Sequence, residues 1–543
     1  MTASFKSLPA DSTPVNNTPL NDRHGNDEPI NVSRRSALKT VAATVAVASG
    51  LPACGGGDGR VAMTTAEQLA LTASGAVAAI RDGNITAEAY ATTLLARAKQ
   101  LASLNAIITL NEAGVLAAAS AVDAKRASGQ PLGALAGLPL LVKDNIDTRD
   151  LPTSGGTPAL KNFQPKTNAP VLQALLDAGA IVLGKANMHE LAFGITSTNA
   201  ATGFVKNPYD VSRIPGGSSG GTAAGIAARI APAGLGSDTG GSTRVPSALC
   251  GTVGMRPSVG NGGADRRYSG AGVIPISHTR DTVGAMARTV ADVALLDSVI
   301  AGKRAPAAAN LSGLRIGLPR AYFWDNLDTE LAAIMNTAVQ RLTTAGVVFV
   351  NADLAGIGAL NDNISFPVAL YETYVDLPKY LLAEGSTLTI DQVAAQISSP
   401  DVQGAFGAAK TFPKAAYDAA IGTFRPQLQQ LYASDFTVNK VDVILFPTTP
   451  LPAVAIDGTF SGAVSINGVA QPGGPNAEFG AYIRNTDPGS NAGIPGLALP
   501  AGMTKGGLPV GREIDGPLGS DTRLLAIGLA IEALLGPLPA PAL

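Results

Sequence analysis

The chain has 543 residues, of which 46% are hydrophobic and 15% charged, and its formal net charge at pH 7 is −2. This balance supplies apolar material for a large core and lacks the basic excess typical of nucleic-acid-binding proteins, so we expect no nucleic-acid partner. No stretch reaches the roughly 20 apolar residues that a membrane-spanning helix requires.

The N-terminal region differs from the rest of the chain in composition. Residues 1–32 are polar and rich in Asn, Pro, Ser and Asp, which is typical of a segment that does not fold. Arg34 and Arg35 then precede an Ala/Val run that ends at Ala53-Cys54. This pattern resembles a twin-arginine export signal that closes with a lipoprotein cleavage box. The alternative is a disordered tail with a chance arginine pair.

On the export interpretation the chain has three parts. Residues 1–53 form the signal peptide, 54–63 a Gly-rich flexible tether, and 64–543 one folded domain. The protein would then be exported to the periplasm, and a lipid on Cys54 would be its only link to a membrane. Since Cys54 and Cys250 are the two cysteines of the chain, we expect no disulfide framework.

Apolar periodicity and capping residues predict alternating helices and strands in the first third of the folded part. In chain order we expect a helix from a Thr64–Glu67 capping box to about Arg81, a helix capped by Thr86, a strand over 106–110, an Ala-rich helix to about Arg126, a strand over 138–142 that delivers Lys143, and a helix and strand within 168–184.

A Gly/Ser-rich segment over 194–275 separates these elements from a second alternating region. There we expect strands at 314–318 and 347–350 around a helix over 328–344, a helical, insertion-like stretch over 365–435, a strand at 441–446 and a core segment at 497–499. The order of elements predicts one α/β domain without repeats or an internal boundary.

Two loops in the Gly/Ser-rich segment combine glycines with hydroxyl side chains. Gly216-Gly217-Ser218-Ser219-Gly220-Gly221 precedes an apolar helix that runs to about Ile230. It lacks the Gly-Lys-Ser/Thr ending of a phosphate-binding loop. The second loop, residues 237–246, follows an apparent strand and contains Gly240-Gly241-Ser242. Consecutive glycines let several backbone N–H groups turn toward one point, as an oxyanion hole requires.

Together with Val142-Lys143-Asp144-Asn145 and Asp281-Thr282-Val283-Gly284, these loops resemble the amidase signature family. Lys143 and Ser218 are 75 positions apart, Ser218 and Ser242 are 24 apart, and the likeness extends from about residue 65 onward. The resemblance implies a single domain built on a large, mixed, twisted β-sheet that helices cover on both faces. It also implies an enzyme that hydrolyses amide C–N bonds of a small-molecule substrate without a cofactor or a metal.

The resemblance also implies a role for each motif residue. Ser242 matches the family's nucleophile, Ser218 the bridging serine that follows a cis peptide bond, and Lys143 a general base that acts as a neutral amine. The residues that match the oxyanion hole, through their backbone N–H groups, are Thr239, Gly240, Gly241 and Ser242, and those that match the surrounding support are Ser219, Asp238 and Arg244.

These roles imply acyl transfer in two steps. Ser242 attacks the carbonyl carbon while its proton moves through Ser218 to Lys143, the leaving amine is protonated along the same relay, and water hydrolyses the acyl-enzyme. Thr243 stands where the family has an aliphatic residue, and Met255-Arg256-Pro257 where it commonly has Leu-Lys-Pro. Neither departure affects a residue that matches the catalytic set.

Other hydrolytic mechanisms have less support in the sequence. A Ser-His-Asp triad would have to use His189 or His278, since no other histidine lies beyond the signal, and there is no Gly-x-Ser-x-Gly elbow. Two histidines and one cysteine without short spacing make no zinc ligand set. A non-catalytic binding lipoprotein on the same fold is a further alternative, which the intact Lys143/Ser218/Ser242 set disfavours.

The substrate class is predicted from the C-terminal segments and from apolar residues near the motifs. Residues 483–495 and 507–517 look most like the indoleacetamide and mandelamide hydrolase branch. We expect an apolar pocket for aryl or arylalkyl amides, with anilides or carbamates as the alternative substrates. The export signal disfavours a tRNA amidotransferase subunit. The residues expected to line the pocket are Phe193, Ile195, Phe366 and Tyr371.

Overall fold

A computed structural model describes residues 63–543 of the chain. The predicted signal peptide and the tether, including Cys54 but not Met63, lie outside the described residues. Among the helices of the described part, none is long and apolar enough to cross a membrane.

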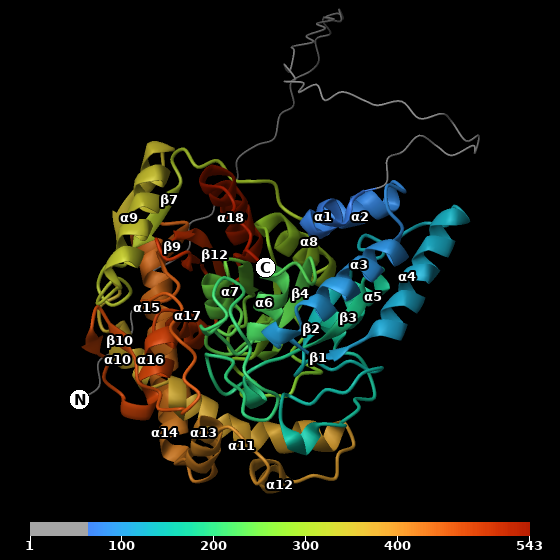
Figure 1. The fold of residues 1–543 in the computed structure, drawn as a ribbon. Helices are drawn as coiled ribbons and strands as arrows, with labels where there is room; N and C mark the ends of the chain where they lie inside the picture. Colours follow the sequence, from blue (N-terminus) through green and yellow to red (C-terminus); the bar gives the residue numbers. More distant parts are fainter. Residues whose placement is uncertain (1–62) are drawn as a thin grey trace, which may run out of the picture. The chain divides into compact units, whose positions relative to one another are not determined.

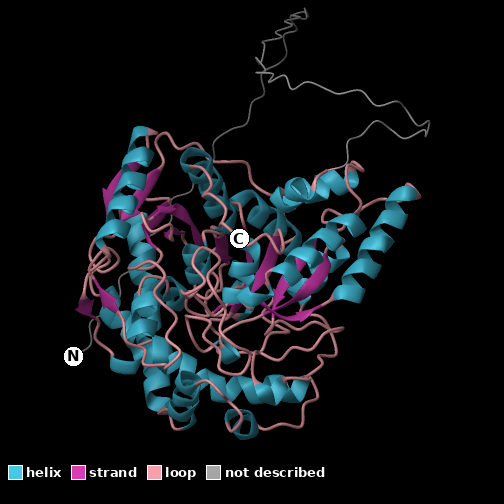
Figure 2. Ribbon diagram, viewed as in Figure 1, coloured by secondary structure: helices cyan, strands magenta, loops and turns pink. Residues whose placement is uncertain are grey.

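An 11-stranded sheet forms the centre of the described part, with helices around it (Figures 1 and 2). Strands β3, β2 and β4 run parallel, as do β8, β7 and β9, whereas the other neighbours pair antiparallel. This confirms the predicted α/β class with a mixed sheet. In sheet order the strands are β1 Ile107–Leu110, β3 Ile181–Ala186, β2 Pro139–Lys143, β4 Ala233–Asp238, β6 Thr282–Ala287, β5 Val253–Arg256, β12 Gly496–Met503, β13 Pro509–Asp515, β9 Val443–Pro447, β7 Arg315–Leu318 and β8 Val348–Asn351. A separate hairpin joins β10 Ser465–Ile466 and β11 Val469–Ala470.

The helices pack on the sheet and on one another around one large apolar cluster and four smaller ones. Helices α11 to α15 occupy the segment that we expected to be a helical insertion. The helices are α1 Thr65–Ala70, α2 Ala73–Arg81, α3 Ala87–Gln100, α4 Glu112–Ala127, α5 Pro170–Asp177, α6 Gly220–Ala227, α7 Arg244–Cys250, α8 Val290–Ile300, α9 Thr329–Thr344, α10 Ile357–Asp362, α11 Ser365–Ala383, α12 Ile390–Ala394, α13 Pro400–Lys410, α14 Lys414–Ala419, α15 Arg425–Val438, α16 Ala477–Ile483, α17 Asp487–Ala492 and α18 Asp521–Leu535.

Capping residues in the sequence predicted the starts of most helices correctly, but they did not predict one helix break. The Thr64–Glu67 capping box is present, and Thr86 caps α3. The single helix expected to run to Arg81 is instead two helices, because Leu71 leaves the helical region and the side chain of Thr72 caps α2 by accepting from the Gly75 N–H. A threonine hydroxyl that competes for backbone N–H groups favours such a restart.

The sheet brings the predicted motifs to one edge. Strands β2 and β4 are parallel neighbours in register from Leu140↔Ala233 to Val142↔Leu235. Because parallel strands end at the same edge, Lys143 at the end of β2 lies beside the end of β4 and the loop that follows it. Ser218 and Ser242 stand in the loops that lead into α6 and α7, two helices that contact each other.

Candidate active site

Lys143 is fully buried and forms hydrogen bonds with two serine side chains. Its Nζ lies 2.7 Å from Ser218 Oγ and 2.8 Å from Ser237 Oγ. Asn145 Nδ2 donates to Ser237 Oγ at 3.0 Å, which holds that hydroxyl in place. The structure therefore brings the lysine and one of the two predicted serines into direct contact.

Burial determines the protonation behaviour of this lysine. Removal from water penalises the ammonium form and lowers the pKa of Lys143 to about 7, although the negative charges of Asp238 and Asp281 act in the opposite direction. A large fraction of Lys143 is therefore neutral near pH 7, and a neutral amine can accept a proton. An ordinary lysine, with a pKa near ~10.4, cannot do so at this pH.

The first serine loop is held against the second. The peptide bond between Gly217 and Ser218 is cis. Ser219 N–H donates to the carbonyl oxygen of Ser242 at 3.2 Å, and the Ser219 hydroxyl donates to the carbonyl of Ser237 at 3.2 Å. The loop that carries Ser218 is thus fixed to the loop that carries Ser242. In the described part of the chain, the Ser242 hydroxyl itself makes no hydrogen bond.

The backbone of the second loop presents a series of N–H groups. The N–H groups of Thr239, Gly240, Gly241 and Ser242 have no hydrogen-bond acceptor among residues 63–543. Gly241 has φ +148°, and a Cβ there would lie 2.2 Å from Thr486 Oγ1, so the position requires glycine. Unpaired N–H groups next to a serine hydroxyl can hold an oxyanion that forms at that serine.

A buried ionic network fixes the start of this loop. Asp238 binds Arg244 at 3.1 Å and Arg256 at 3.0 Å, and it accepts hydrogen bonds from the N–H and the hydroxyl of Thr243. Burial by itself would raise the pKa of Asp238, but the charges of the two arginines outweigh it and hold the pKa well below its usual range. Both departures from the family pattern, Thr243 and Arg256, therefore contact Asp238.

Substitution of Asp238 by asparagine is expected to lower the free energy of unfolding by about 3–5 kcal/mol, because it leaves the buried guanidinium of Arg256 without its counter-charge and leaves Arg244 with Glu513 alone. The shift in Tm on thermal unfolding measures this effect. The matched control is Asp150→Asn, which breaks an exposed pair with Arg149 and should change stability by less than about 1 kcal/mol. Equal Tm shifts for the two variants would contradict a supporting role for Asp238.

Ser242 lines a cavity of about 140 Å³. Three of the four expected pocket residues, Phe193, Ile195 and Phe366, also line it. Tyr371, the fourth, does not line this cavity: its ring stacks on that of Tyr417, with 4.3 Å between the ring centroids. Residues 366 and 371 lie five positions apart on α11, about 140° around the helix, so they face different sides. The apolar lining residues are Ala192, Phe193, Ile195, Ile276, Phe366, Ala369, Leu370, Ala405, Phe460, Phe479 and Ile483.

The cavity carries more charge than the sequence indicated. Its charged or titratable lining residues are His189, Arg280, Asp401, Asp457 and Glu478. His189 Nε2 lies 2.8 Å from Asp401 Oδ2, Arg280 pairs with Asp487, and Asp457 accepts hydrogen bonds from Thr459 and Ser461. The Glu478 carboxyl has no hydrogen bond among the described residues, and burial, followed by the nearby Asp457, raises its pKa to about 7.

The histidine in this cavity is not placed as the base of a triad. Nδ1 of His189 contacts Thr196 Oγ1 at 3.4 Å and Nε2 binds Asp401, so both ring nitrogens face groups other than Ser242. Lys143, by contrast, contacts the serine loop directly. The geometry thus favours the Lys143–Ser218 arrangement over a Ser-His-Asp triad.

Comparison with known proteins identifies the family. A family model described as Amidase matches residues 89–525. The chain belongs to the amidase signature family. It is 45% identical over 444 residues to the indoleacetamide hydrolase of Agrobacterium vitis, which covers 81% of this chain and 92% of that protein. It is 39% identical over 491 residues to the mandelamide hydrolase of Pseudomonas putida, which covers 87% of this chain and 92% of that protein.

A solved structure shows the same fold. The peptide amidase of Stenotrophomonas maltophilia superimposes with a TM-score of 0.73 at 29% sequence identity, over 87% of this chain and 98% of that one. The protein is accordingly an amidase, a hydrolase that acts on C–N bonds.

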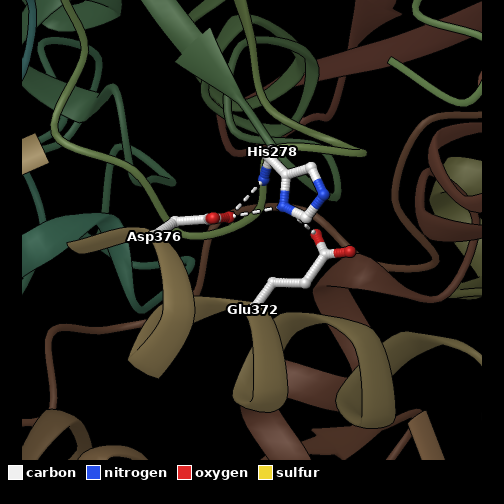
Figure 3. A group of neighbouring side chains, drawn as sticks. All are labelled: His278, Glu372 and Asp376. Carbon is white, nitrogen blue, oxygen red and sulfur yellow. Dashed lines mark hydrogen bonds and ion pairs between the residues drawn. The ribbon is translucent and has the colours of Figure 1, made fainter. Parts of the chain in front are cut away.

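One cluster in this amidase has the composition of a cation site. The ligand atoms of His278, Glu372 and Asp376 lie within 4.8 Å of one another (Figure 3). Glu372 already accepts hydrogen bonds from Ser277, Thr279 and Tyr417, and His278 Nδ1 lies 2.7 Å from Asp376 Oδ2. The hydrogen bond to Asp376 raises the pKa of His278, which favours an ion pair. We assign the cluster to anchoring the loop at 277–279 on α11.

Several residues around the amidase site were not assigned from the sequence. Ser237 and Asn145 belong to the quoted motifs but give no separate signal for their contact with Lys143. Asp281, also in a quoted motif, accepts a hydrogen bond from Thr239 Oγ1 at 2.7 Å and so orients the second loop. Glu478 lies outside the quoted motifs, five positions before the segment 483–495, and its neighbours in the sequence do not indicate its place in the cavity.

Proposed function

We propose that this amidase hydrolyses aryl or arylalkyl amides through a Ser242–Ser218–Lys143 relay and an acyl-enzyme. The observation that carries the proposal is the buried Lys143 amine, 2.7 Å from Ser218 Oγ and with its pKa lowered to about 7 by burial, beside the loop of Ser242. In this scheme Ser218 accepts the proton of Ser242 as it passes its own to Lys143, so both serines stay neutral until the attack.

The same loops then stabilise the oxyanion and protonate the leaving group. The N–H groups from Thr239 to Ser242 hold the negative charge that develops on the carbonyl oxygen. Lys143, protonated after the attack, returns its proton through Ser218 to the departing nitrogen. Protonation of this nitrogen is what amide cleavage requires, because an unprotonated amide nitrogen is a poor leaving group. The supporting Asp238–Arg244 pair keeps the second loop in position during both steps.

The lining of the cavity supports the choice of acyl group. Aromatic and aliphatic side chains, among them Phe193, Phe366 and Phe479, face the space that Ser242 also faces. Such a surface favours an aryl or arylalkyl acyl group attached to a small amide nitrogen. Relatives named as indoleacetamide and mandelamide hydrolases agree with this class. Asp401, Asp457 and Glu478 disfavour a substrate that carries its own carboxylate.

A substrate series tests the proposed class. We expect kcat/KM for phenylacetamide to exceed that for glutamine by about 30- to 150-fold, because burial of the phenyl ring is worth roughly 2–3 kcal/mol. An anilide and a carbamate in the same series measure tolerance for other leaving groups, and faster turnover of either would favour the alternative substrates. Glu478→Gln should raise activity on glutamine more than on phenylacetamide. Preference of the unaltered enzyme for glutamine would contradict the proposed pocket and favour an amidotransferase-like function.

We also propose that the amidase is exported and anchored through Cys54, on the basis of the sequence alone. Replacement of Arg34 and Arg35 by lysine is expected to leave the precursor in the cytoplasm, since the twin-arginine pathway recognises the arginine pair. Cys54→Ala should remove the lipid and release the protein from membranes. Cell fractionation with mass determination of the mature N-terminus measures both effects. A native protein that stays uncleaved in the cytosol would contradict export and leave the chemistry of the site untouched.

A further inference from the structure

A second cavity, of about 270 Å³, lies at the far ends of the two helices that begin at the serine loops. Ala227, the last residue of α6, and Gly251, which follows the last residue of α7, both line it. Ser218 and Ser242 precede the opposite ends of these helices. The second cavity shares no lining residue with the cavity of Ser242 among residues 63–543. It is therefore separate from the catalytic site.

Arginine dominates the charged lining of this second cavity. Three arginines, Arg229, Arg288 and Arg512, face it together with one acidic residue, Glu532. Arg288 is engaged by the protein, because it donates to the carbonyl oxygens of residues 71, 226 and 231. Glu532 accepts a hydrogen bond from the N–H of residue 290 at 2.9 Å. The other two arginines of the lining, Arg229 and Arg512, have side-chain nitrogen atoms that the described part of the protein does not engage in this way.

Arg512 is buried, with 1% of its surface exposed, and its side chain makes no hydrogen bond or ion pair with residues 63–543. Its Nε and Nη1 are buried without an acceptor, as is Nε of Arg229. Successive side chains of a strand point to opposite faces. On β13 this rule separates Arg512 from Glu513, which binds Arg244 of the buried ionic network around Asp238. The Arg512 charge therefore has no role in that network.

An unpaired guanidinium in a protein interior is strongly unfavourable, so a position of this kind calls for a partner. Burial lowers the pKa of Arg512 to about 9, although the negative charge of Glu532, which forms no ion pair with it, acts in the opposite direction; the group is still charged at neutral pH. We propose that the second cavity is a binding site for a small oxyanion, a carboxylate or a phosphate, held by Arg512 and Arg229. The planar fork of a guanidinium binds two oxygens of either group at once. A carboxylate from amide hydrolysis and free phosphate share this chemistry.

Isothermal titration calorimetry on the full-length enzyme tests the site. Phosphate, sulfate and phenylacetate are titrated separately into chloride buffer at one ionic strength. We expect binding of at least one of them to weaken by about tenfold or more in Arg512→Met and in Arg229→Gln. Arg523→Gln, which removes an exposed arginine of α18 that pairs with Asp442, is the matched control and should bind like the wild type. A phenylacetate response that is lost in Arg512→Met identifies the carboxylate as the ligand, because phenylacetate that binds as the reaction product in the Ser242 cavity would bind this variant equally well. A phosphate or sulfate response that is lost in the variant identifies the tetrahedral oxyanion.

Thermal unfolding provides a second measurement that does not depend on amidase activity. In chloride buffer without an oxyanion Arg512→Met should raise Tm, because methionine fills a similar volume without the unpaired charge. Added phosphate or phenylacetate should raise the Tm of the wild type more than that of the variant. Binding that is equal in wild type and Arg512→Met, or a variant that is less stable than the wild type without the anion, would overturn the proposal. The second result would assign Arg512 to a structural link with Glu532.

Discussion

Replacement of Ser242 by alanine is expected to lower kcat by about 10⁴-fold or more and to abolish covalent labelling by a fluorophosphonate, because the variant has no nucleophile in the relay. The other hydroxyls of the cavity do not replace it. Thr239 Oγ1 donates to Asp281, and the hydroxyls of Thr196 and Thr198 bind each other at 2.7 Å. Steady-state hydrolysis of phenylacetamide and a labelling gel measure the two effects.

Ser365→Ala is the matched control for this experiment. Ser365 lines the same cavity, but its side chain makes no hydrogen bond among the described residues. We expect it to keep labelling and to change kcat by less than about threefold. Labelling that persists in Ser242→Ala, with the label mapped to another residue, would show that the nucleophile is wrongly assigned. An unchanged Tm in Ser242→Ala would show that the loss is chemical and not a folding defect.

Replacement of Lys143 by alanine is expected to lower kcat/KM by about 10³–10⁴-fold, because members of a proton relay fail together. Lys143→Arg separates the two ways in which the lysine could act. Arginine retains the positive charge but stays protonated at every accessible pH, so it cannot accept a proton. We expect no rescue by Lys143→Arg. If arginine restored activity, the site would need a charge at this position and not a base.

His189→Gln tests the alternative base, because His189 lines the same cavity and is paired with an acidic residue, Asp401. If the lysine is the base, this variant should lose less than about tenfold in kcat, with changes mainly in KM. A loss in His189→Gln that matches the loss in Lys143→Ala would favour the histidine as base. Both losses are measured on phenylacetamide at the same pH.

The residues of the proposed catalytic set could be picked out from the sequence because they stand in short motifs at element ends. Lys143 ends a strand, and Ser218 and Ser242 each precede a helix, so local composition marks all three. The supporting partners depend on pairings between distant strands. Glu513, for example, reaches Arg244 only because α7 packs on β13, more than 260 positions further along the chain. Nothing in the local sequence around Glu513 indicates that arrangement.

The pocket was harder to predict for a related reason. Phe193 and Ile195 lie near a motif and their positions follow from it, but Phe366 and Tyr371 belong to a helix whose rotation about its own axis is set by tertiary packing. Only one face of α11 lines the cavity. Phe366 lies on that face, whereas Tyr371 lies on another and stacks on Tyr417. The strand β13 itself was not expected, and neither was the unpaired Arg512 that it carries into the second cavity.

The dependence of kcat/KM on pH tests the central claim, a neutral Lys143 that acts as base. Because burial lowers the pKa of Lys143 to about 7, the neutral fraction grows as pH rises through that value. We expect kcat/KM to rise about tenfold per pH unit below the pKa and to level off above it. Burial also raises the pKa of Glu478 to about 7. Glu478→Gln must therefore show the same rise of kcat/KM with pH if this rising limb of the profile reports the titration of Lys143. A rate that is flat through pH 7, or a limb that disappears in Glu478→Gln, would contradict the assignment of Lys143.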